Sequence, residues 1–562
     1  MAGGLLNIIS VGTNNIILTG TPTKTFFKVM YSKYTNFGLQ KFRTDYEGSR
    51  SLRLTEDSTF SFKMPRYAEL LMDTYLVVTL PNIWSPICNP IHPSINPEAN
   101  TNNKWASYDF RWIKDLGTQI IREISITCGS QTIQRYSGQY LAAMVERDFS
   151  SEKKELFNRM TGNIEEIYDP ANAFSRVNAY PSAYYTANIL GAEPSIRGRQ
   201  LYIPINTWFT FDSRCAFPLI CLQYNELYIN VTLRPIQELF QVRDIYDPAN
   251  NYPYIQPDFN KEYFQMYRFL QTPPSVYIQP NQYETDNMYT NKITDWNADV
   301  HLLSTYCFLS KEEVQLFASE DQMYLIKDVF QYNFQNLVGS SKIRLTSNGM
   351  VSSWMWFFQR NDVNMRNEWS NYTNWPYRTV PSDVQLAPNK CILDPSFGGY
   401  GPYTNPDGSN TGLFISGDFN ADNQKEILET MGILLNGDYR ENIMTNGVYN
   451  YVEKYTRTQG SAKDGLYCYN FCLNTSPFEY QPSGAINLSK FKNIDLEIST
   501  FVPVIDTVNS EYQIICSPSG VPIGVSKQNW RLYEYNYNMV LFEERYNILS
   551  FIGGNAGMLY AR

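Results

Sequence analysis

Apolar and polar residues alternate with a period of two in many short stretches of this chain. In 226–235 one face holds four apolar residues, Leu227, Ile229, Val231 and Leu233. The same alternation recurs over 122–130 and 493–500. Strands with one apolar face pack on one side only, as in antiparallel sandwiches. Because many such runs are separated by turn residues, the pattern favours a sandwich or barrel over alternating strand–helix folds.

Helical patterns are sparse. The stretch 138–162 is rich in good helix formers, which predicts a helix there. A second helix is predicted over 310–320, where Ser310 stands in the N-cap position and Glu313 follows three residues later. Both stretches are expected to connect strands rather than to carry function.

Composition supports a mostly β chain of more than one domain. The 562 residues include 43 Tyr, 32 Phe and 10 Trp, which suit half-buried strands, and 31 Gly and 30 Pro, which suit turns. A single core stops growing at roughly 250–300 residues, so two large domains are expected. A segment rich in Pro, Asn and Tyr near the middle, 245–263, is the natural boundary.

Charge and cysteine usage exclude some classes of protein. The net charge is −9 and Lys and Arg form no cluster, which argues against direct binding of nucleic acid. Nine scattered cysteines, an odd number, are typical of free buried thiols in a reducing compartment. The chain has no apolar run of about 18 residues and no basic segment at its start, so neither a membrane span nor a signal peptide is expected.

One serine stands where a nucleophile on a tight turn would stand. Ser483 lies between Pro482 and Gly484, yet the Gly-x-Ser-x-Gly pattern of hydrolases is absent. The two histidines, His92 and His301, lie in no motif with a nucleophile. The residues therefore indicate a structural turn at Pro482, Ser483 and Gly484, and no catalytic, cofactor-binding or metal site is predicted. A hydrolase using Ser483 stays a remote alternative.

Four Asn-x-Ser/Thr triplets occur, at Asn230, Asn371, Asn474 and Asn487. Asn371 is the best candidate for glycosylation, because it falls in the long stretch 361–425 that is expected to form a surface loop. Without a secretory signal, a chance triplet is the favoured interpretation.

Several blocks, in order along the chain, resemble one protein family. The first is MAGGLLNIISVGTNNIILTGTPTKTFFKVMYSKYTNF (1–37), and the second is FDSRCAFPLICLQYNELYINVTLRP (211–235). SNGMVSSWMWFFQRND (347–362), the long block 440–498 and the ending YNILSFIGGNAGMLYAR (546–562) follow. Together they resemble the major capsid proteins of nucleocytoplasmic large DNA viruses, most closely the mimivirus-like and phycodnavirus-like branch.

The resemblance implies an all-β fold of two consecutive eight-stranded antiparallel jelly rolls. It implies trimeric, pseudo-hexameric capsomers that tile an icosahedral shell above an internal membrane. It places the chain in the virion, made and assembled in the host cytoplasm. The expected division of the chain is an N-terminal arm (1–25), a first jelly roll (26–242), a linker (243–295), a second jelly roll (296–545) with an inserted loop (361–425), and a C-terminal tail (546–562).

The expected partners are other copies of the chain, neighbouring capsomers and minor capsid proteins. The apolar N-terminal arm, uncharged before Lys24, is expected either to contact the inner membrane or a minor protein, or to pack under its own trimer. The loop 361–425 is expected to form an enlarged external tower. Two alternatives stay open: a minor or scaffolding double jelly-roll protein, and a carbohydrate-binding β-sandwich lectin.

Overall fold

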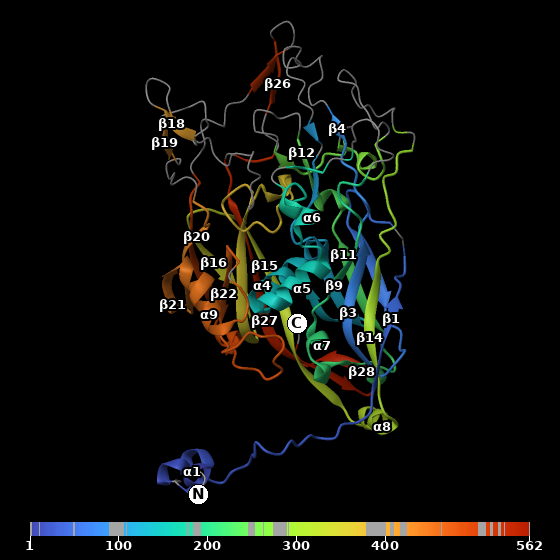
Figure 1. Ribbon diagram of the computed structural model, residues 1–562, viewed down its shortest axis with the longest axis vertical. Coiled ribbons are helices and arrows are strands. Elements are labelled where there is room, and N and C mark those ends of the chain that lie inside the picture. The colour runs from blue at the N-terminus through green and yellow to red at the C-terminus, as the bar shows by residue number, and fades with distance from the viewer. Residues whose placement is uncertain are drawn as a thin grey trace.

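Strands dominate the computed structural model of the chain, in which two sandwiches stand side by side (Figure 1). The residues that the structure describes are 3–9, 12–48, 51–88, 106–107, 109–176, 179–181, 183, 193–244, 253–261, 264–273, 289, 291–377, 401–404, 410–415, 424–461, 463–503, 513–516, 521–526, 530–532 and 534–560.

Two facing sheets form the first sandwich. One sheet has the order β1-β14-β3-β10, with β9 also paired to β3. Its strands are β1 (Gly38–Thr44), β3 (Leu70–Thr79), β9 (Gln200–Pro204), β10 (Phe217–Pro218) and β14 (His301–Phe308). The other sheet has the order β2-β11-β7-β8. Its strands are β2 (Ser58–Lys63), β7 (Ile121–Cys128), β8 (Gln131–Tyr136) and β11 (Leu227–Leu233).

The second sandwich repeats this arrangement. Its first sheet has the order β15-β27-β17-β22, with β23 and β28 at its margins, and its second sheet has the order β16-β24-β20-β21. The first sheet contains β15 (Gln322–Leu337), β17 (Met350–Arg360), β22 (Leu466–Asn470), β23 (Ile486–Asn487), β27 (Tyr537–Ile552) and β28 (Asn555–Met558). The second contains β16 (Ser340–Leu345), β20 (Leu428–Leu435), β21 (Asp438–Thr445) and β24 (Ile494–Thr500). Every pairing between these strands is antiparallel.

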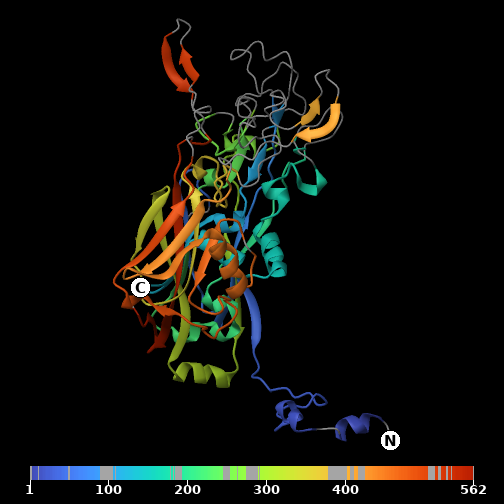
Figure 2. The ribbon, with the colours of Figure 1, turned by 90° about the vertical axis from the view of Figure 1, so that its left-hand side faces the viewer.

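Short sheets and hairpins lie at one end of the molecule, the upper end in Figure 1. They comprise β4 (Ile87–Cys88) with β5 (Ala106–Ser107), β6 (Phe110–Trp112) with β12 (Phe240–Arg243) and β13 (Tyr254–Ile255), β18 (Gly401–Thr404) with β19 (Asn410–Ile415), and β25 (Gln513–Cys516) with β26 (Pro522–Ser526). At the opposite end the N-terminal arm leaves the body, as both side views show (Figures 1 and 2).

Helices are few and short. They are α1 (Gly3–Ile9), α2 (Ile16–Thr19), α3 (Leu116–Gln119), α4 (Gly138–Asp148), α5 (Ser151–Thr161), α6 (Glu165–Tyr168), α7 (Trp208–Phe211), α8 (Lys311–Ser319) and α9 (Glu453–Arg457), the last continuing a π-helical turn, η14 (Val448–Val452). The predicted helix 138–162 is two helices, because Ser150 starts a new one by accepting a hydrogen bond from the Lys153 amide. The predicted cap of α8 is confirmed: Ser310 accepts from the Glu313 amide.

The predicted period-two strands are confirmed. In β11 the burial alternates strictly, with Leu227, Ile229, Val231 and Leu233 inside. The strand β17 is buried on both faces from Val351 onward. Trp354 and Trp356 pack into the core of the second sandwich, whereas Met355 and Phe357 belong to the core that continues from the first. One strand therefore contributes to two cores: the first core extends onto one face of β17, and the other face of β17 lines the separate core of the second sandwich.

Three of the expected domain limits differ from the structure. The segment 243–295 is not a free linker: Phe264, Met266 and Phe269 are buried in the first core. The strand β14, expected in the second domain, pairs with β1 and β3 of the first. Thus α8, not 243–295, connects the sandwiches. At the other end, β27 runs to Ile552 and pairs with β28, so most of the expected tail is strand.

Candidate assembly surfaces

The two sandwiches meet along β8 of the first and β15 of the second, with α4 beside them. The Gln134 side-chain amide donates to the Lys327 carbonyl across this junction at 2.9 Å. Apolar residues of β15, including Tyr324 and Ile326, are buried in the shared core. This junction is a permanent interface inside the chain, since it combines apolar packing with paired polar groups.

A cluster of buried charged side chains stabilises the same junction. Arg147 of α4 lies 2.7 Å from an Asp148 oxygen and 2.8 Å from an oxygen of Glu544 on β27. Tyr140 donates to Glu544 at 2.9 Å, and Thr475 donates to Asp148 at 2.6 Å. Every member is almost fully buried. The cluster links α4 to the second sandwich, so α4 is more than a connector between strands.

The two carboxylates of this cluster respond differently to their surroundings. Burial alone raises the pKa of Glu544, but Arg147 and Lys327 outweigh burial and lower it to about 2. For Asp148 burial outweighs the attraction of Arg147, and the pKa is raised.

A cavity of about 80 Å³ lies beside the cluster, lined among others by Gln134, Lys327 and Thr475. It is far smaller than the roughly 300–1,000 Å³ of ordinary ligand pockets.

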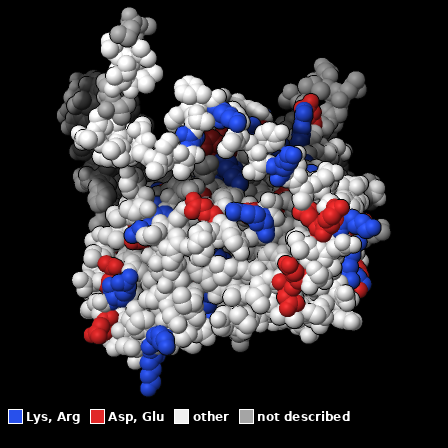
Figure 3. All heavy atoms as spheres, turned by 90° about the horizontal axis from the view of Figure 1, so that it is seen from below, with Lys and Arg blue, Asp and Glu red and all other residues white. Residues whose placement is uncertain are grey.

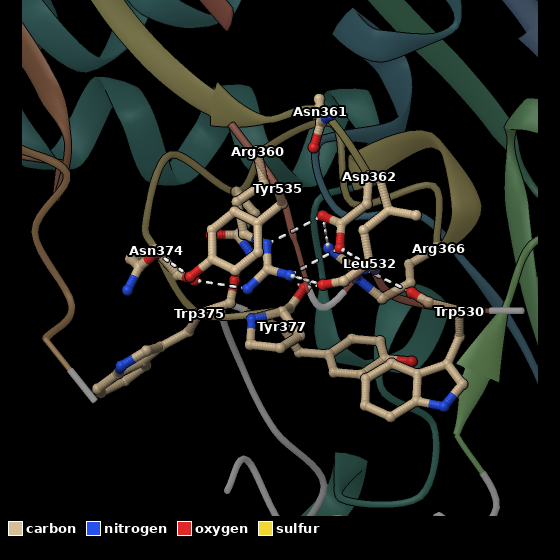
Figure 4. Close-up of polar contacts among 12 residues, drawn as sticks. Arg360, Asn361, Asp362, Arg366, Asn374, Trp375, Tyr377, Trp530, Leu532 and Tyr535 are labelled. Carbon is tan, nitrogen blue, oxygen red and sulfur yellow. Dashed lines mark hydrogen bonds and ion pairs between the residues drawn. The ribbon is translucent and has the colours of Figure 1, made fainter. Parts of the chain in front are cut away.

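A second polar cluster, the Arg360–Asp362–Arg366 clasp, holds the upper end of the second sandwich (Figure 4). The fully buried Asp362 accepts two hydrogen bonds from Arg360 at 2.9 and 2.7 Å and one from Arg366 at 3.0 Å. It also accepts from the Leu532 amide at 2.9 Å. Burial raises the pKa of Asp362, but the two guanidinium groups outweigh it and the pKa is lowered. The clasp joins the end of β17 to the segment before β27, from which the upper loops leave.

The segment 361–377 is part of the packed interior, contrary to its expected place in a surface loop. Asn367 donates to the carbonyls of Gln237 and Phe240 at 2.7 and 2.8 Å, and the Trp369 indole donates to the Glu238 carbonyl at 3.0 Å. These contacts tie the second sandwich to the first. The rest of the expected loop is described only at 401–404 and 410–415, which form the β18–β19 hairpin, and at 424–425.

Asn371 is accordingly not the exposed glycosylation candidate that the sequence suggested. Its side chain is 1% exposed. The amide donates to the Trp375 carbonyl at 2.8 Å, and the side-chain oxygen accepts from the Thr373 hydroxyl at 2.7 Å. A buried amide with these partners offers a glycosylating enzyme no access in the folded chain, so a chance triplet stays our prediction.

The Pro482-Ser483-Gly484 stretch lies between β22 and β23. The Ser483 hydroxyl accepts from the Asn474 amide at 3.0 Å and donates to the Asn474 carbonyl at 2.9 Å. Gly484 has a φ of +133°, a conformation that favours glycine. The hydroxyl therefore bonds the backbone of a residue nine positions earlier in the chain. His301 bonds the Asp299 carbonyl, and His92 lies outside the described residues.

Other chemistry-bearing residues have structural surroundings. Of the cysteines that the structure describes with their side chains, Cys128, Cys215, Cys307, Cys468 and Cys472 are buried and Cys221 is half-buried, all as free thiols. Burial raises the pKa of Cys468 to about 12. Across the described part of the chain, no three His, Cys, Asp or Glu side chains group as metal ligands. None of its helices is long and apolar enough to cross a membrane.

The N-terminal arm, residues 3–37 as described, extends away from the body (Figure 2). Its apolar side chains are exposed throughout, from Leu5 and Leu6 to Phe26, Phe27 and Phe37. One hydrogen bond, from Thr35 to Glu313 of α8 at 2.7 Å, joins it to the body. Residues 1–44 contain five cations, Lys24, Lys28, Lys33, Lys41 and Arg43, and no carboxylate. The arm is thus apolar and basic in a chain that is acidic overall.

The body of the protein has no basic surface at this end comparable to that of the arm. Seen from below, Lys and Arg lie interspersed with Asp and Glu, and much of the face is uncharged (Figure 3). A surface of mixed charge does not steer a partner of one sign over distance. Basic character at this end therefore belongs to the lysines of the arm, because Arg43 of β1 is paired with Asp45 and Asp299.

Two family descriptions match the chain. One, the N-terminus of major capsid proteins, matches residues 25–271, and the other, the major capsid protein of large eukaryotic DNA viruses, matches residues 313–557. The major capsid protein of Phaeocystis pouchetii virus is 24% identical over 99% of both chains.

Solved structures agree on the fold. A capsid chain of the PBCV-1 virus superposes with a TM-score of 0.58 at 19% identity, covering 96% of this chain and 100% of that one. The Faustovirus major capsid protein superposes with a TM-score of 0.58 at 12% identity, covering 98% of both. The fold is the double jelly roll. The chain belongs to the major capsid proteins of large eukaryotic DNA viruses, and its place is the capsid shell of the virion.

Proposed function

We propose that three copies of the chain form one capsomer and that such trimers tile the icosahedral shell of a large double-stranded DNA virus. The observation that supports this most is the internal repeat: two sandwiches of matching strand order stand side by side in one chain. Three chains then present six similar sandwiches, which gives a trimer a pseudo-hexameric outline. Such an outline suits close packing in a shell.

Sedimentation of the purified full-length chain tests the trimer. The expected species is a trimer of the 65.1 kDa chain, held by interfaces of the size typical of obligate oligomers, roughly 2,000–5,000 Å². A stable monomer at all concentrations would overturn the proposal. A 65.1 kDa band that dominates purified virions would support the major over a minor or scaffolding role.

We also propose an orientation for the capsomer. The arm end faces the virion interior and the end carrying the β18–β19 and β25–β26 hairpins faces outward, with β18–β19 as part of an external tower. The arm supports this, since apolar residues with cations and no carboxylates suit an anionic lipid surface or an acidic minor capsid protein. Packing of the arm beneath its own trimer is the competing arrangement.

Deletion of residues 1–20 separates these two roles of the arm. If the arm contacts the membrane or a minor protein, the shortened chain still forms trimers, but shells fail to assemble. If the arm packs beneath its own trimer, the trimers themselves become unstable. Particles observed by electron microscopy and trimers observed by sedimentation give the two readouts independently.

The protein is proposed to act without catalysis, cofactor or direct contact with nucleic acid, and to assemble in the host cytoplasm. The Ser483 hydroxyl, held by two bonds to Asn474, supports a structural role for that serine. Hydrolysis of ester substrates that is lost in a Ser483→Ala variant would contradict this. Saturable binding on a glycan array would favour the lectin alternative instead.

A further inference from the structure

We infer that residues 24–37 of the N-terminal arm fold into an amphipathic helix on the surface of an anionic lipid membrane. The inference rests on the proposed inward orientation of the arm and names both the segment and its partner. Residues 21–36 form neither helix nor strand in the structure. Among the described residues, their backbone makes no hydrogen bond to another backbone group. The segment can therefore fold on a partner without breaking existing structure.

The apolar side chains of this segment are exposed almost completely. Six of them are between 81% and 99% exposed, namely Phe26, Phe27, Val29, Met30, Tyr31 and Tyr34. The ring contacts found among the described residues are local: the Lys24 ammonium lies over the Phe26 ring, and Tyr34 lies beside Phe37. So much exposed apolar surface in one short segment indicates an apolar partner.

The order of the residues fits a helix. At about 100° per residue, six apolar residues fall within about 140° of the helix circumference. They are Phe26, Phe27, Met30, Tyr31, Tyr34 and Phe37. The opposite face is polar throughout and consists of Lys24, Thr25, Lys28, Ser32, Thr35 and Asn36. Val29 and Lys33 lie at one boundary between the faces. A strand would instead place Phe27, Lys33 and Phe37 on one side, so the segment has no apolar strand face.

The chemistry of the two faces favours anionic lipid as the partner. A helix with bulky apolar residues on one face and lysines on the other is typical of helices that lie in a membrane interface. Tyrosine suits that position, because its ring is apolar and its hydroxyl reaches water. The segment contains Lys24, Lys28 and Lys33 and no carboxylate. Its charge is thus complementary to anionic headgroups, which attract each lysine near the surface.

The length of the segment explains why its helix needs the membrane. Fourteen residues would span about 21 Å as a helix. Isolated helices shorter than roughly 12–15 residues are marginal in water. Aromatic and β-branched residues, which are frequent here, lower the helix propensity further. Burial of the apolar face in lipid offsets the conformational entropy that is lost when the segment is ordered.

The attachment to the body determines which face turns toward the lipid. Thr35 belongs to the polar face, and its hydroxyl donates to Glu313 of α8 at 2.7 Å. The polar face is therefore turned toward the body and the apolar face away from it. The preceding helices α1 and α2 carry no charged residue, so they add apolar area but no preference for anionic lipid. Deletion of residues 1–20 leaves the lysine-bearing segment in place.

Flotation of the full-length protein with vesicles tests the inference. One vesicle contains phosphatidylcholine alone, and the other contains phosphatidylcholine and phosphatidylserine in equal parts. A triple variant, Lys24→Gln with Lys28→Gln and Lys33→Gln, removes the charge. Met30→Pro prevents the helix without changing the charge. Met30→Ala is its matched control, because it loses the same side chain but keeps a strong helix former. Hydrogen exchange at the amides of 28–37 reports the helix directly.

The wild type and Met30→Ala are expected to float with the mixed vesicles and not with phosphatidylcholine alone, and their amides at 28–37 are expected to exchange more slowly when bound. The triple lysine variant is expected to bind the mixed vesicles on the order of a hundredfold more weakly. Met30→Pro is expected neither to float nor to gain protection.

Equal flotation of Met30→Pro and Met30→Ala would overturn the helix, and equal flotation on both vesicles would overturn the preference for anionic lipid. No flotation on either vesicle would overturn lipid as the partner and favour an acidic protein. Protection of 28–37 before vesicles are added would also overturn the inference, since it means that the arm packs beneath its own trimer. Sedimentation of the same preparations keeps these outcomes apart from the proposed function, which a monomeric wild type would contradict whatever its flotation.

Discussion

Arg147 on α4 and Glu544 on β27 form an ion pair of 2.8 Å in the interior, although 397 residues separate them. Both side chains are at most 2% exposed. The pair joins the first half of the chain to β27, a long strand of the second sandwich. A shell that carries load needs its building block to move as one body, and this pair is one of the contacts that make the two sandwiches one.

Removal of Arg147 is expected to weaken the attachment between the two sandwiches strongly. An Arg147→Met change leaves Asp148 and Glu544 buried without the guanidinium group that pairs with both, which costs about 3–5 kcal/mol of the free energy of unfolding. Urea unfolding measures the loss. Arg159→Met is the control, because Arg159 forms an exposed ion pair with Glu155 that is worth less than about 1 kcal/mol. Equal losses of the free energy of unfolding in Arg147→Met and Arg159→Met would contradict a stabilising role for the cluster.

The same cluster predicts a specific sensitivity to acid. Because the pKa of Glu544 falls from an ordinary 4.5 to about 2 on folding, its stabilisation is fully present above about pH 4.5 and is lost as the pH falls toward 2. Asp148 acts in the opposite sense: its raised pKa costs stability at neutral pH, and acid relieves that cost as the pH falls through the folded value.

A Glu544→Gln variant separates these two carboxylates. Its thermal midpoint is expected to lie below that of the wild type at about pH 7 and to fall less on going to about pH 3, since the titrating group is gone. Glu320→Gln, at an exposed position, is expected to follow the wild type at both values. If the thermal midpoint falls equally in Glu544→Gln and in the wild type between these two pH values, Glu544 does not contribute to the acid response.

The Arg360–Asp362–Arg366 clasp makes a third prediction. Asp362→Asn leaves two buried guanidinium groups without a carboxylate, so we expect a loss of about 3–5 kcal/mol and faster hydrogen exchange at the Leu532 amide, which donates to Asp362. Asp321→Asn is the exposed control. Unchanged exchange at Leu532 would contradict the role of the clasp at the root of the upper loops.

Asn371 is expected to carry no glycan in virions, because its side chain is buried and bonded to Trp375 and Thr373. Mass spectrometry of proteolytic peptides measures this directly. Peptides that contain the half-buried Asn487 serve as the comparison within one digest. A glycan mass at Asn371 would mean that the segment 361–377 opens during synthesis or assembly.

Local patterns in the sequence sufficed for the strands but not for their partners. The alternation in β11 predicts its buried face, because one side of that strand meets one core. The apolar run in β17 predicts a strand, but not that its two faces enter different cores. The boundary near residue 296 failed for a related reason: nothing in 301–308 indicates that this strand closes a sheet begun more than 250 residues earlier.

For the candidate sites, too, the sequence predicts local features but not contacts between distant parts of the chain. The turn predicted at Ser483 rests on proline and glycine, which act on their own neighbourhood. The burial of Asn371 was not, because the segment around it is polar in sequence and is satisfied by carbonyl groups from distant parts of the chain, such as those that bond Asn367. The surfaces through which copies associate depend on which strands lie at the edges of each sheet. The sequence alone does not specify the order of the strands.

The N-terminal arm contributes little to the folding of its own chain, since among the residues that the structure describes a single hydrogen bond joins it to the body. In the proposed assembly, the free energy from burying its apolar residues is therefore withheld from the folding step and is released when the arm meets its partner. A subunit built this way can fold first and commit to the shell later, and the interval between the two steps is when its exposed arm makes the chain most prone to aggregate.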